Sequence, residues 1–202
     1  MFPISHFNIT KTPFYYYDKT LLSNTLAKLI RLAGERNYHV HYAVKANANP
    51  EILKLIAASG IGADCVSGGE IKAALEAGFP AKKIVFAGVG KADWEIEYAL
   101  EKKIFCFNVE SAEELSVIEE LDKKKENIAS IALRINPNID AHTHEYITTG
   151  LSENKFGIPI EMLDSIFSQI QRSPHVQLVG FHFHIGSQIL NLETFHVLCE
   201  RI

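Results

Sequence analysis

The apolar segment Tyr42-Ala-Val-Lys45 ends in a lysine, and lysine is rarely buried without a partner. In the simplest interpretation, Lys45 lies at the end of a strand, where its amine reaches water or pairs with Asp64. In the more specific interpretation, the amine is desolvated, sheds its proton readily and forms an imine with a carbonyl cofactor. The first interpretation requires no function, whereas the second requires further groups around the amine.

A second set of candidate residues lies in His182-Phe-His184 and in the adjacent pair Gly186-Ser187. The two histidines are two residues apart, so in a strand they face the same side. Their rings could pack in the core against a backbone carbonyl, bind a metal as a pair, or stack on a flat cofactor. Gly186 and Ser187, ahead of a helix start, could offer N–H groups and a hydroxyl to a phosphate, although such a pair is often only a turn.

Three charged residues complete the candidate set. Arg134 ends an apolar segment and needs an anionic or acceptor partner if it is buried. Asp64 and Glu70 are candidates for that partner, as is a cofactor oxygen, but an internal arginine–carboxylate pair without any ligand fits equally well. Polar residues therefore come after nearly every apolar segment, and this clustering is more informative than any single residue.

Six short apolar segments rich in β-formers are expected to be the strands that position these residues. They span 39–45, 61–66, 84–87, 104–109, 128–135 and 177–184. Helical patterns are expected over 22–33, 50–59, 71–77, 92–102, 111–125, 159–171 and 192–201. Local signals mark several helix ends, among them Asn49-Pro50, Gly78 and the capping box Ser111-Ala-Glu-Glu114.

The strands start roughly every 20 to 26 residues, with a longer gap that carries an inserted loop over 136–156, and this rhythm predicts an α/β fold with a parallel sheet. The sheet could be open and doubly wound, or a closed (β/α)8 barrel of the TIM type. No G-x-G-x-x-G fingerprint comes after an early strand, and Gly88-Val-Gly90 lacks the third glycine. We therefore expect the barrel, incomplete at about six of eight βα units, and hence the front part of a longer protein, because an unclosed barrel exposes two strand edges.

The composition is that of an ordinary globular chain, with 202 residues, 47% of them hydrophobic and 22% charged. A formal net charge of −4 without a basic stripe argues against nucleic acid or a membrane surface as a partner. No apolar run approaches the length of a membrane span, and the N-terminus lacks the pattern of a signal peptide. Cys65, Cys106 and Cys199 are far apart, which indicates a reducing, cytoplasmic compartment; the first two are expected in the core.

Six blocks of residues resemble the diaminopimelate decarboxylases, pyridoxal-phosphate enzymes with a barrel of the alanine racemase type (fold type III). The blocks occur in the expected order and cover most of the chain. They are Tyr42-Ala-Val-Lys-Ala-Asn47, Asp64-Cys-Val-Ser-Gly-Gly-Glu70, Asn108-Val-Glu-Ser-Ala-Glu-Glu-Leu115, Leu133-Arg-Ile-Asn-Pro137, Thr149-Gly with Asn154-Lys-Phe-Gly-Ile158, and Gly180-Phe-His-Phe-His-Ile-Gly-Ser-Gln188.

The resemblance implies pyridoxal 5'-phosphate as the cofactor and assigns a role to each candidate. Lys45 would bind the cofactor covalently, and His184 would stack on its pyridine face. Ser187, together with Gly186, would contact the phosphate. The resemblance further places Arg134 near the cofactor, with Asp64 and Glu70 beside it.

The implied reaction is decarboxylation of meso-2,6-diaminopimelate to L-lysine and carbon dioxide, the last step of lysine biosynthesis. Related decarboxylases of ornithine and arginine share the barrel. Gln188 and the block Lys155-Phe-Gly-Ile158 are more similar to the diaminopimelate branch.

The chain departs from the family after the sixth strand. The later glycine-rich phosphate loop, a Glu-Pro-Gly-Arg block and a β-domain are absent from these residues; in the family, that domain completes the partner's site in a homodimer. Phe14 to Asp18 resembles the strand that joins the β-domain, which divides the chain into an N-terminal segment, 1–36, and a partial barrel, 37–202. The 202 residues alone are therefore expected to be inactive, and Cys199, in a helical pattern, is not assigned the role of the family's cysteine.

Three alternatives remain open at this point. One is a non-catalytic pyridoxal-phosphate-binding barrel that uses Lys45 without decarboxylating anything. Another is a metal hydrolase barrel with His182 and His184 as ligands, although only Asp64 and Glu70 are available to complete its site. The last is an interaction fragment without any site.

Overall fold

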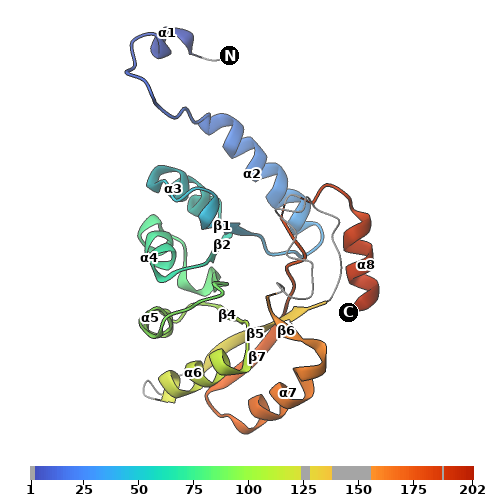
Figure 1. Cartoon of the computed structure of the whole chain (residues 1–202). Coiled ribbons are helices and arrows are strands. Elements are labelled where there is room, and N and C mark those ends of the chain that lie inside the picture. Colours follow the sequence, from blue (N-terminus) through green and yellow to red (C-terminus); the bar gives the residue numbers. More distant parts are fainter. Residues whose placement is uncertain (1–2, 124–127, 138–155, 188) are drawn as a thin grey trace. The chain divides into compact units, whose positions relative to one another are not determined.

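The computed structural model describes residues 3–123, 128–137, 156–187 and 189–202, and the chain forms two compact units, Met1–Tyr38 and His39–Ile202 (Figure 1). The first unit contains α1 (Ile4–Phe7) and α2 (Lys19–Gly34). Asp18 begins α2 by accepting a hydrogen bond from the backbone N–H of Leu21 at 2.9 Å. Residues 14–18 pair with no other strand in the described part of the chain, so their role as a strand that joins a β-domain stays a prediction.

The sheet of the second unit is parallel throughout, and its strand order follows the chain (Figure 1). Strands β1 to β5 add one after another, and β7 pairs with β5. A doubly wound sheet would instead reverse its order at a switch point, so the prediction of consecutive barrel units is confirmed. The strands are β1 (His41–Ala43), β2 (Gly62–Cys65), β3 (Ile84–Phe86), β4 (Cys106–Val109), β5 (Ala129–Asn136), β6 (Ile158–Pro159) and β7 (Val176–His182).

Helices alternate with the strands, and α3 to α6 pack in succession, each against the next (Figure 1). The helix ends predicted from the sequence are confirmed at Asn49 and Gly78. Asn49 accepts hydrogen bonds from the N–H groups of Glu51 and Ile52, and Gly78 ends α4 at a φ of 99°. The helices are α3 (Pro50–Ala58), α4 (Gly68–Ala77), α5 (Asp93–Lys102), α6 (Ala112–Lys123), α7 (Leu163–Arg172) and α8 (Glu193–Arg201).

Several predicted boundaries near the strand ends were wrong. β1 stops at Ala43, and Lys45 lies in a short 3-10 helix, η1 (Val44–Ala46). β7 stops at His182, so His184 lies beyond the strand. The helix expected from 159 begins at Leu163, after the unpredicted two-residue strand β6 and the turn η3 (Ile160–Met162). Apolar patterning continues through these turns, so the sequence alone does not mark where pairing ends.

The core of the second unit lies between the sheet and its helices. Phe86, Ile131 and Leu133 are fully buried, as expected for strands covered on both faces. Cys65 and Cys106 are buried, which confirms their core placement, and burial raises the pKa of Cys106 to about 12, so its thiol stays protonated.

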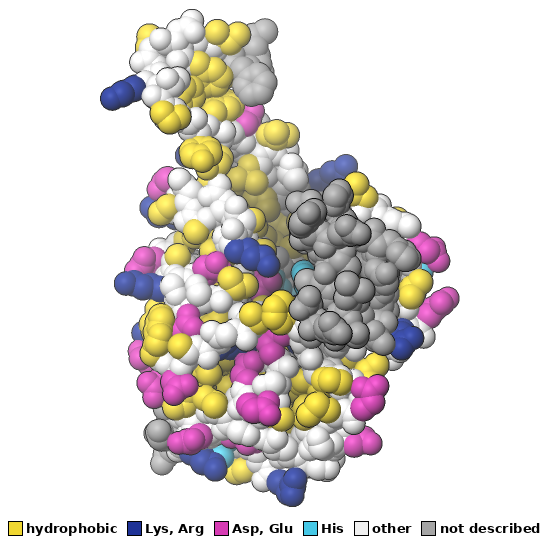
Figure 2. All heavy atoms as spheres, viewed as in Figure 1, with side chains coloured by type: hydrophobic (Ala, Val, Ile, Leu, Met, Phe, Trp, Pro, Cys, Tyr) yellow, Lys and Arg dark blue, Asp and Glu magenta, His cyan; other side chains and the backbone are white. Residues whose placement is uncertain are grey.

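On the surface face shown in Figure 2, acidic and basic side chains are interspersed, and no basic stripe crosses its described part. Among the described residues, no helix combines the length and apolar character needed to cross a bilayer.

Gly88, just after β3, is buried and close to the backbone at the end of β2. An added Cβ would overlap the carbonyl oxygen of Val66, whereas at Gly90 nothing lies within 4 Å. We expect Gly88→Ala to lower the free energy of unfolding by about 1–3 kcal/mol because backbone must move, and the control Gly90→Ala to change it by less than about 0.5 kcal/mol. Chemical denaturation of the full-length apo protein checks this, and equal effects of the two substitutions would contradict it.

Candidate active site

Lys45 and Asp64 lie at neighbouring strand ends. Ala43 of β1 is in register with Asp64 of β2, and Lys45 comes two residues later with its side chain exposed. Burial raises the pKa of Asp64, while the positive charge of Lys45 opposes the rise, so the two groups are close enough to interact electrostatically. No direct ion pair joins them in the described part of the chain, and Asp64 Oδ1 is shielded from solvent without a hydrogen-bond partner there. The simplest interpretation of Lys45 allowed an amine that reaches water or one that pairs with Asp64. The exposed side chain fits the first possibility, and no direct pair is present among the described residues.

The two histidines lie at the end of β7 and just beyond it. His182 is in register with Arg134 of β5 and is partly buried, and its Nδ1 has no partner within the described residues. Burial, and then the charge of Arg134, lower the pKa of His182 to about 4. His184 is largely exposed, yet partial desolvation of its ring lowers its pKa as well, and the charges of Arg134 and Lys45 add to that effect. Both rings are thus neutral at neutral pH, and His184 lies within electrostatic reach of Lys45.

The depressed pKa of His182 predicts a pH dependence of stability. Between about pH 4 and pH 6.5 the unfolded chain binds a proton at this residue that the folded chain does not. The stability is therefore complete above pH 6.5 and is lost as the pH falls towards 4, by up to about 3 kcal/mol from this residue.

Denaturation of the full-length apo protein at a series of pH values should show this slope reduced in His182→Gln. The matched substitution His196→Gln, at an exposed position on α8, should leave the slope unchanged. Identical pH profiles of wild type and His182→Gln would contradict the prediction.

Gly186 and Ser187 lie next to the histidines but not at the start of a helix. Gly186 has a φ of 146°, in the region that favours glycine, and Ser187 is exposed. The helix expected over 192–201 is confirmed as α8, which begins at Glu193, so the pair lies ahead of a helix start but not in its first turn. Any phosphate contact by this pair would come from the turn itself, without the help of a helix N-terminus. Gln188, which the sequence linked to substrate choice, lies outside the described residues.

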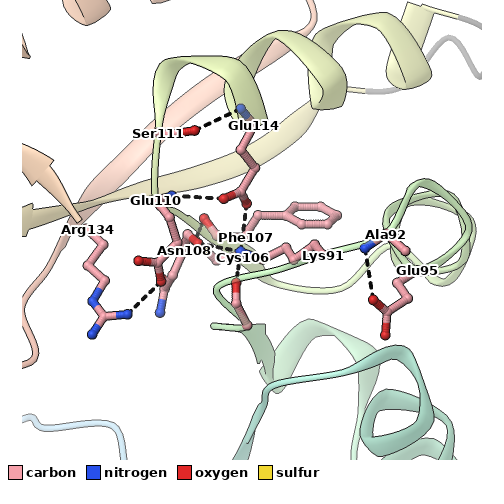
Figure 3. Close-up of polar contacts among 11 residues, drawn as sticks. Lys91, Ala92, Glu95, Cys106, Phe107, Asn108, Glu110, Ser111, Glu114 and Arg134 are labelled. Atoms are coloured by element: carbon pink, nitrogen blue, oxygen red, sulfur yellow. Dashed lines mark hydrogen bonds and ion pairs between the residues drawn. The ribbon is translucent and has the colours of Figure 1, made fainter. Parts of the chain in front are cut away.

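Arg134 is buried and pairs with Glu110 (Figure 3), which confirms the alternative of an internal arginine–carboxylate pair and corrects the candidate partners Asp64 and Glu70. Its Nη1 donates to Glu110 Oε1 at 2.7 Å. The guanidinium lies 5.6 Å from the ring centroid of Phe156, and a Cβ at Gly157 would meet the carbonyl oxygen of Arg134 at 2.9 Å. The block that includes Phe156 and Gly157 therefore packs on Arg134; its preceding residues, 149–155, lie outside the described part.

Glu70 belongs to a helix start. Its Oε2 accepts from the N–H of Val66 at 2.8 Å, while Ser67 Oγ accepts from the N–H of Glu70 at 3.2 Å. This is the pattern Ser-x-x-Glu, the same signal that the sequence shows at Ser111 and Glu114. One carboxylate oxygen of Glu70 is thus committed to the backbone, although its charge still acts on Asp64.

Lys91 and Glu114 are charged residues that the sequence interpretation missed as neighbours of the candidate site. The amine of Lys91 lies 2.6 Å from Glu114 Oε1, and Glu114 Oε2 accepts from the N–H of Glu110 at 3.0 Å (Figure 3). Glu114 was identified only as a capping residue. The signal for Lys91 was present in its position, because it comes after β3 just as Lys45 comes after β1.

The described residues fit a flat, anionic carbonyl cofactor better than a metal. They offer an accessible amine, a neutral exposed imidazole, a glycine–serine turn and buried polar atoms without partners on Asp64 and His182. Within the described ranges, no three His, Cys, Asp or Glu side chains converge as metal ligands would.

The chain is similar to known proteins over most of its length. The diaminopimelate decarboxylase of Bacteroides thetaiotaomicron is 57% identical over 203 residues, which cover 100% of this chain and 53% of that protein. The one from Campylobacter jejuni is 43% identical and covers 92% of this chain and 46% of its own length. The chain thus spans about half the length of the curated relatives it matches.

Solved structures agree in fold. A diaminopimelate decarboxylase mutant from Helicobacter pylori, complexed with L-lysine, superposes with a TM-score of 0.91 and 44% identity, over 98% of this chain and 50% of that one. The arginine decarboxylase of Paramecium bursaria Chlorella virus has a TM-score of 0.81 at 22% identity over 98% of this chain and 50% of that one, which supports the fold alone. The model of the family described as "pyridoxal-dependent decarboxylase, pyridoxal binding domain" matches residues 23–202. The chain therefore belongs to the pyridoxal-dependent decarboxylases, and residues 23–202 match the pyridoxal-binding domain of that family.

Proposed function

We propose that the full-length protein decarboxylates meso-2,6-diaminopimelate to L-lysine and carbon dioxide, the last step of lysine biosynthesis. The observation that carries the proposal is the placement of Lys45 within electrostatic reach of both Asp64 and His184, at the carboxyl ends of the parallel strands of a pyridoxal-binding domain. Active sites of βα barrels lie at that end. The names of the relatives support the substrate, since those more than 40% identical include diaminopimelate decarboxylases from several bacteria.

Two residues of this chain would contact the cofactor directly, each in a different way. Lys45 would attach pyridoxal phosphate covalently, because its amine is accessible to a carbonyl. His184, with a neutral ring, would stack on the pyridine face. When bound, the cofactor supplies an electron sink for the pair that the departing carboxylate leaves behind.

The remaining candidate residues would bind and orient the cofactor. Ser187 and the N–H groups of the turn at Gly186 would contact the phosphate, since both lie next to His184. Arg134, Asp64 and Glu70 would set the charge beside the cofactor; their mutual electrostatic influence supports this. We further propose that the full-length protein is a cytoplasmic homodimer, by analogy with the family.

The test uses full-length protein supplied with pyridoxal phosphate. Borohydride reduction and then peptide mapping should place the label on Lys45, and incubation with meso-diaminopimelate should yield L-lysine and carbon dioxide in equal amounts. Parallel incubations with L-ornithine and L-arginine serve as competing substrates. Label on another lysine would contradict the assignment of Lys45, faster turnover of ornithine or arginine would contradict the substrate, and bound cofactor without carbon dioxide release would indicate the non-catalytic carrier.

A further inference from the structure

Four buried charged side chains form a continuous row from the end of β3 to β5, here called the ion row: Lys91, Glu114, Glu110 and Arg134 (Figure 3). Their side chains are 0%, 12%, 8% and 7% exposed, in that order. Positive and negative charges are equal in number, so the row as a whole is neutral when all four groups are ionised. Buried charges are costly unless they are paired in this way.

The amine of Lys91 is held by other groups of the protein. Its Nζ donates to the carbonyl oxygens of Gly88 at 2.5 Å and Asn108 at 2.8 Å, and lies 2.6 Å from Glu114 Oε1. Two of its three donors are thus used by backbone carbonyls, and its charge is paired with that of Glu114. Lys91 therefore acts on its surroundings by neutralising Glu114 and by tying the loop after β3 to β4.

Glu114 connects the Lys91 end of the row to the Arg134 end. Its Oε1 faces Lys91, while its Oε2 accepts from the backbone N–H of Glu110 at 3.0 Å. The side chain of Glu110 then accepts from Arg134 at 2.7 Å, and its second oxygen has no partner among the described residues. The position of the Glu110 carboxylate thus depends on the bond that holds its own backbone and on Arg134.

Arg134 is the member of the ion row whose charge acts on several residues of the candidate site. Its charge acts on Asp64, His182 and His184, as their altered pKa values record. A shift of the guanidinium would therefore change the electrostatics at several residues that would surround the cofactor.

We propose that Glu114 is a positioning residue of the pyridoxal site, which fixes Arg134 through Glu110, and that Lys91 is the buried counter-ion that makes this possible. The inference rests on the proposed function, because Arg134 must lie beside a bound cofactor for its position to matter. It adds Glu114 and Lys91 to the residues that determine the geometry of the site, although neither would contact the cofactor or the substrate.

The test compares two neutral double variants of the full-length protein. Lys91→Met with Glu114→Gln removes both charges but keeps an amide oxygen that can accept from the N–H of Glu110, whereas Lys91→Met with Glu114→Met removes that acceptor. We expect the dissociation constant of pyridoxal phosphate to rise about tenfold in the methionine pair and to stay within about threefold of wild type in the glutamine pair. The pH at which the absorbance of the bound cofactor changes should shift in the methionine pair only.

Two further variants separate positioning from folding. Glu114→Asp keeps the charge opposite Lys91 but shortens the reach to Glu110, so it too should weaken cofactor binding, and it serves if the methionine pair does not fold. Ser111→Ala removes the hydrogen bond that Ser111 Oγ accepts from the backbone N–H of Glu114 at the same helix start. It should lower the unfolding midpoint of the apo protein without changing cofactor affinity or spectrum.

Cofactor affinity equal to wild type in both the methionine pair and Glu114→Asp would overturn the positioning role. So would equal weakening in both double variants, or an equal weakening by Ser111→Ala. A wild-type protein that takes up no cofactor would overturn the proposed function together with this inference, so the two failures are distinguishable.

Discussion

Lys45→Ala in the full-length protein should abolish covalent attachment of pyridoxal phosphate and lower kcat/KM for meso-diaminopimelate by about 10³-fold or more, because the nucleophilic amine is lost. The apo protein should keep its stability, since the Lys45 side chain is exposed and forms no ion pair within the described residues. Absorbance of the bound cofactor, borohydride labelling and lysine release measure the three consequences.

The control for this substitution is another lysine that comes after the same strand. Lys54, on α3, is 58% exposed and pairs only with Glu51 at 3.0 Å among the residues that the structure describes. Lys54→Ala should therefore leave cofactor attachment and turnover unchanged. Lys45→Arg keeps the charge but cannot replace the amine, so it should be as inactive as Lys45→Ala. Retained labelling in either Lys45 variant would show that a different lysine binds the cofactor.

Arg134→Met should lower the free energy of unfolding of the full-length apo protein by about 3–5 kcal/mol, because it leaves Glu110 buried and unpaired. Glu110 is 8% exposed, and burial already raises its pKa while Arg134 opposes the rise. Without the guanidinium, the carboxyl must bind a proton or remain as an isolated buried charge. Urea denaturation near neutral pH measures the loss.

Two comparisons test whether the unpaired charge of Glu110 causes the loss of stability in Arg134→Met. Arg134→Met combined with Glu110→Met removes both charges and should recover most of the stability, since two apolar side chains replace the pair. Arg31→Met breaks the exposed pair with Glu35, whose side chains are 62% and 54% exposed, and should cost less than about 1 kcal/mol. Equal losses in Arg134→Met and Arg31→Met would contradict the buried-charge explanation.

Features that depend on residues near one another in the chain could be predicted from the sequence. Asn49 and Ser111 were predicted to begin helices, and both accept hydrogen bonds from N–H groups two or three residues later. Each of the six apolar segments overlaps a strand. In β4 and β5 nearly all side chains are buried, as burial of a parallel strand on both faces demands. The residues just after those strands consequently converge at one edge of the sheet, as the position of Lys45 near Asp64 illustrates.

The partners of the buried charges could not be predicted, because they come from different βα units. Arg134 and Glu110 are 24 residues apart, and Asp64 and Glu70 were equally reasonable acceptors until the register of β4 and β5 was known. Lys91 and Glu114 likewise pair across two βα units. Local sequence patterns indicate the role of a residue within its own helix or strand. The identity of a buried counter-ion depends instead on tertiary packing, which brings particular side chains within about 3 Å of each other in a region that excludes water. The residue types and their order therefore specify the pyridoxal-binding domain, and three-dimensional packing selects which carboxylate holds the arginine beside it.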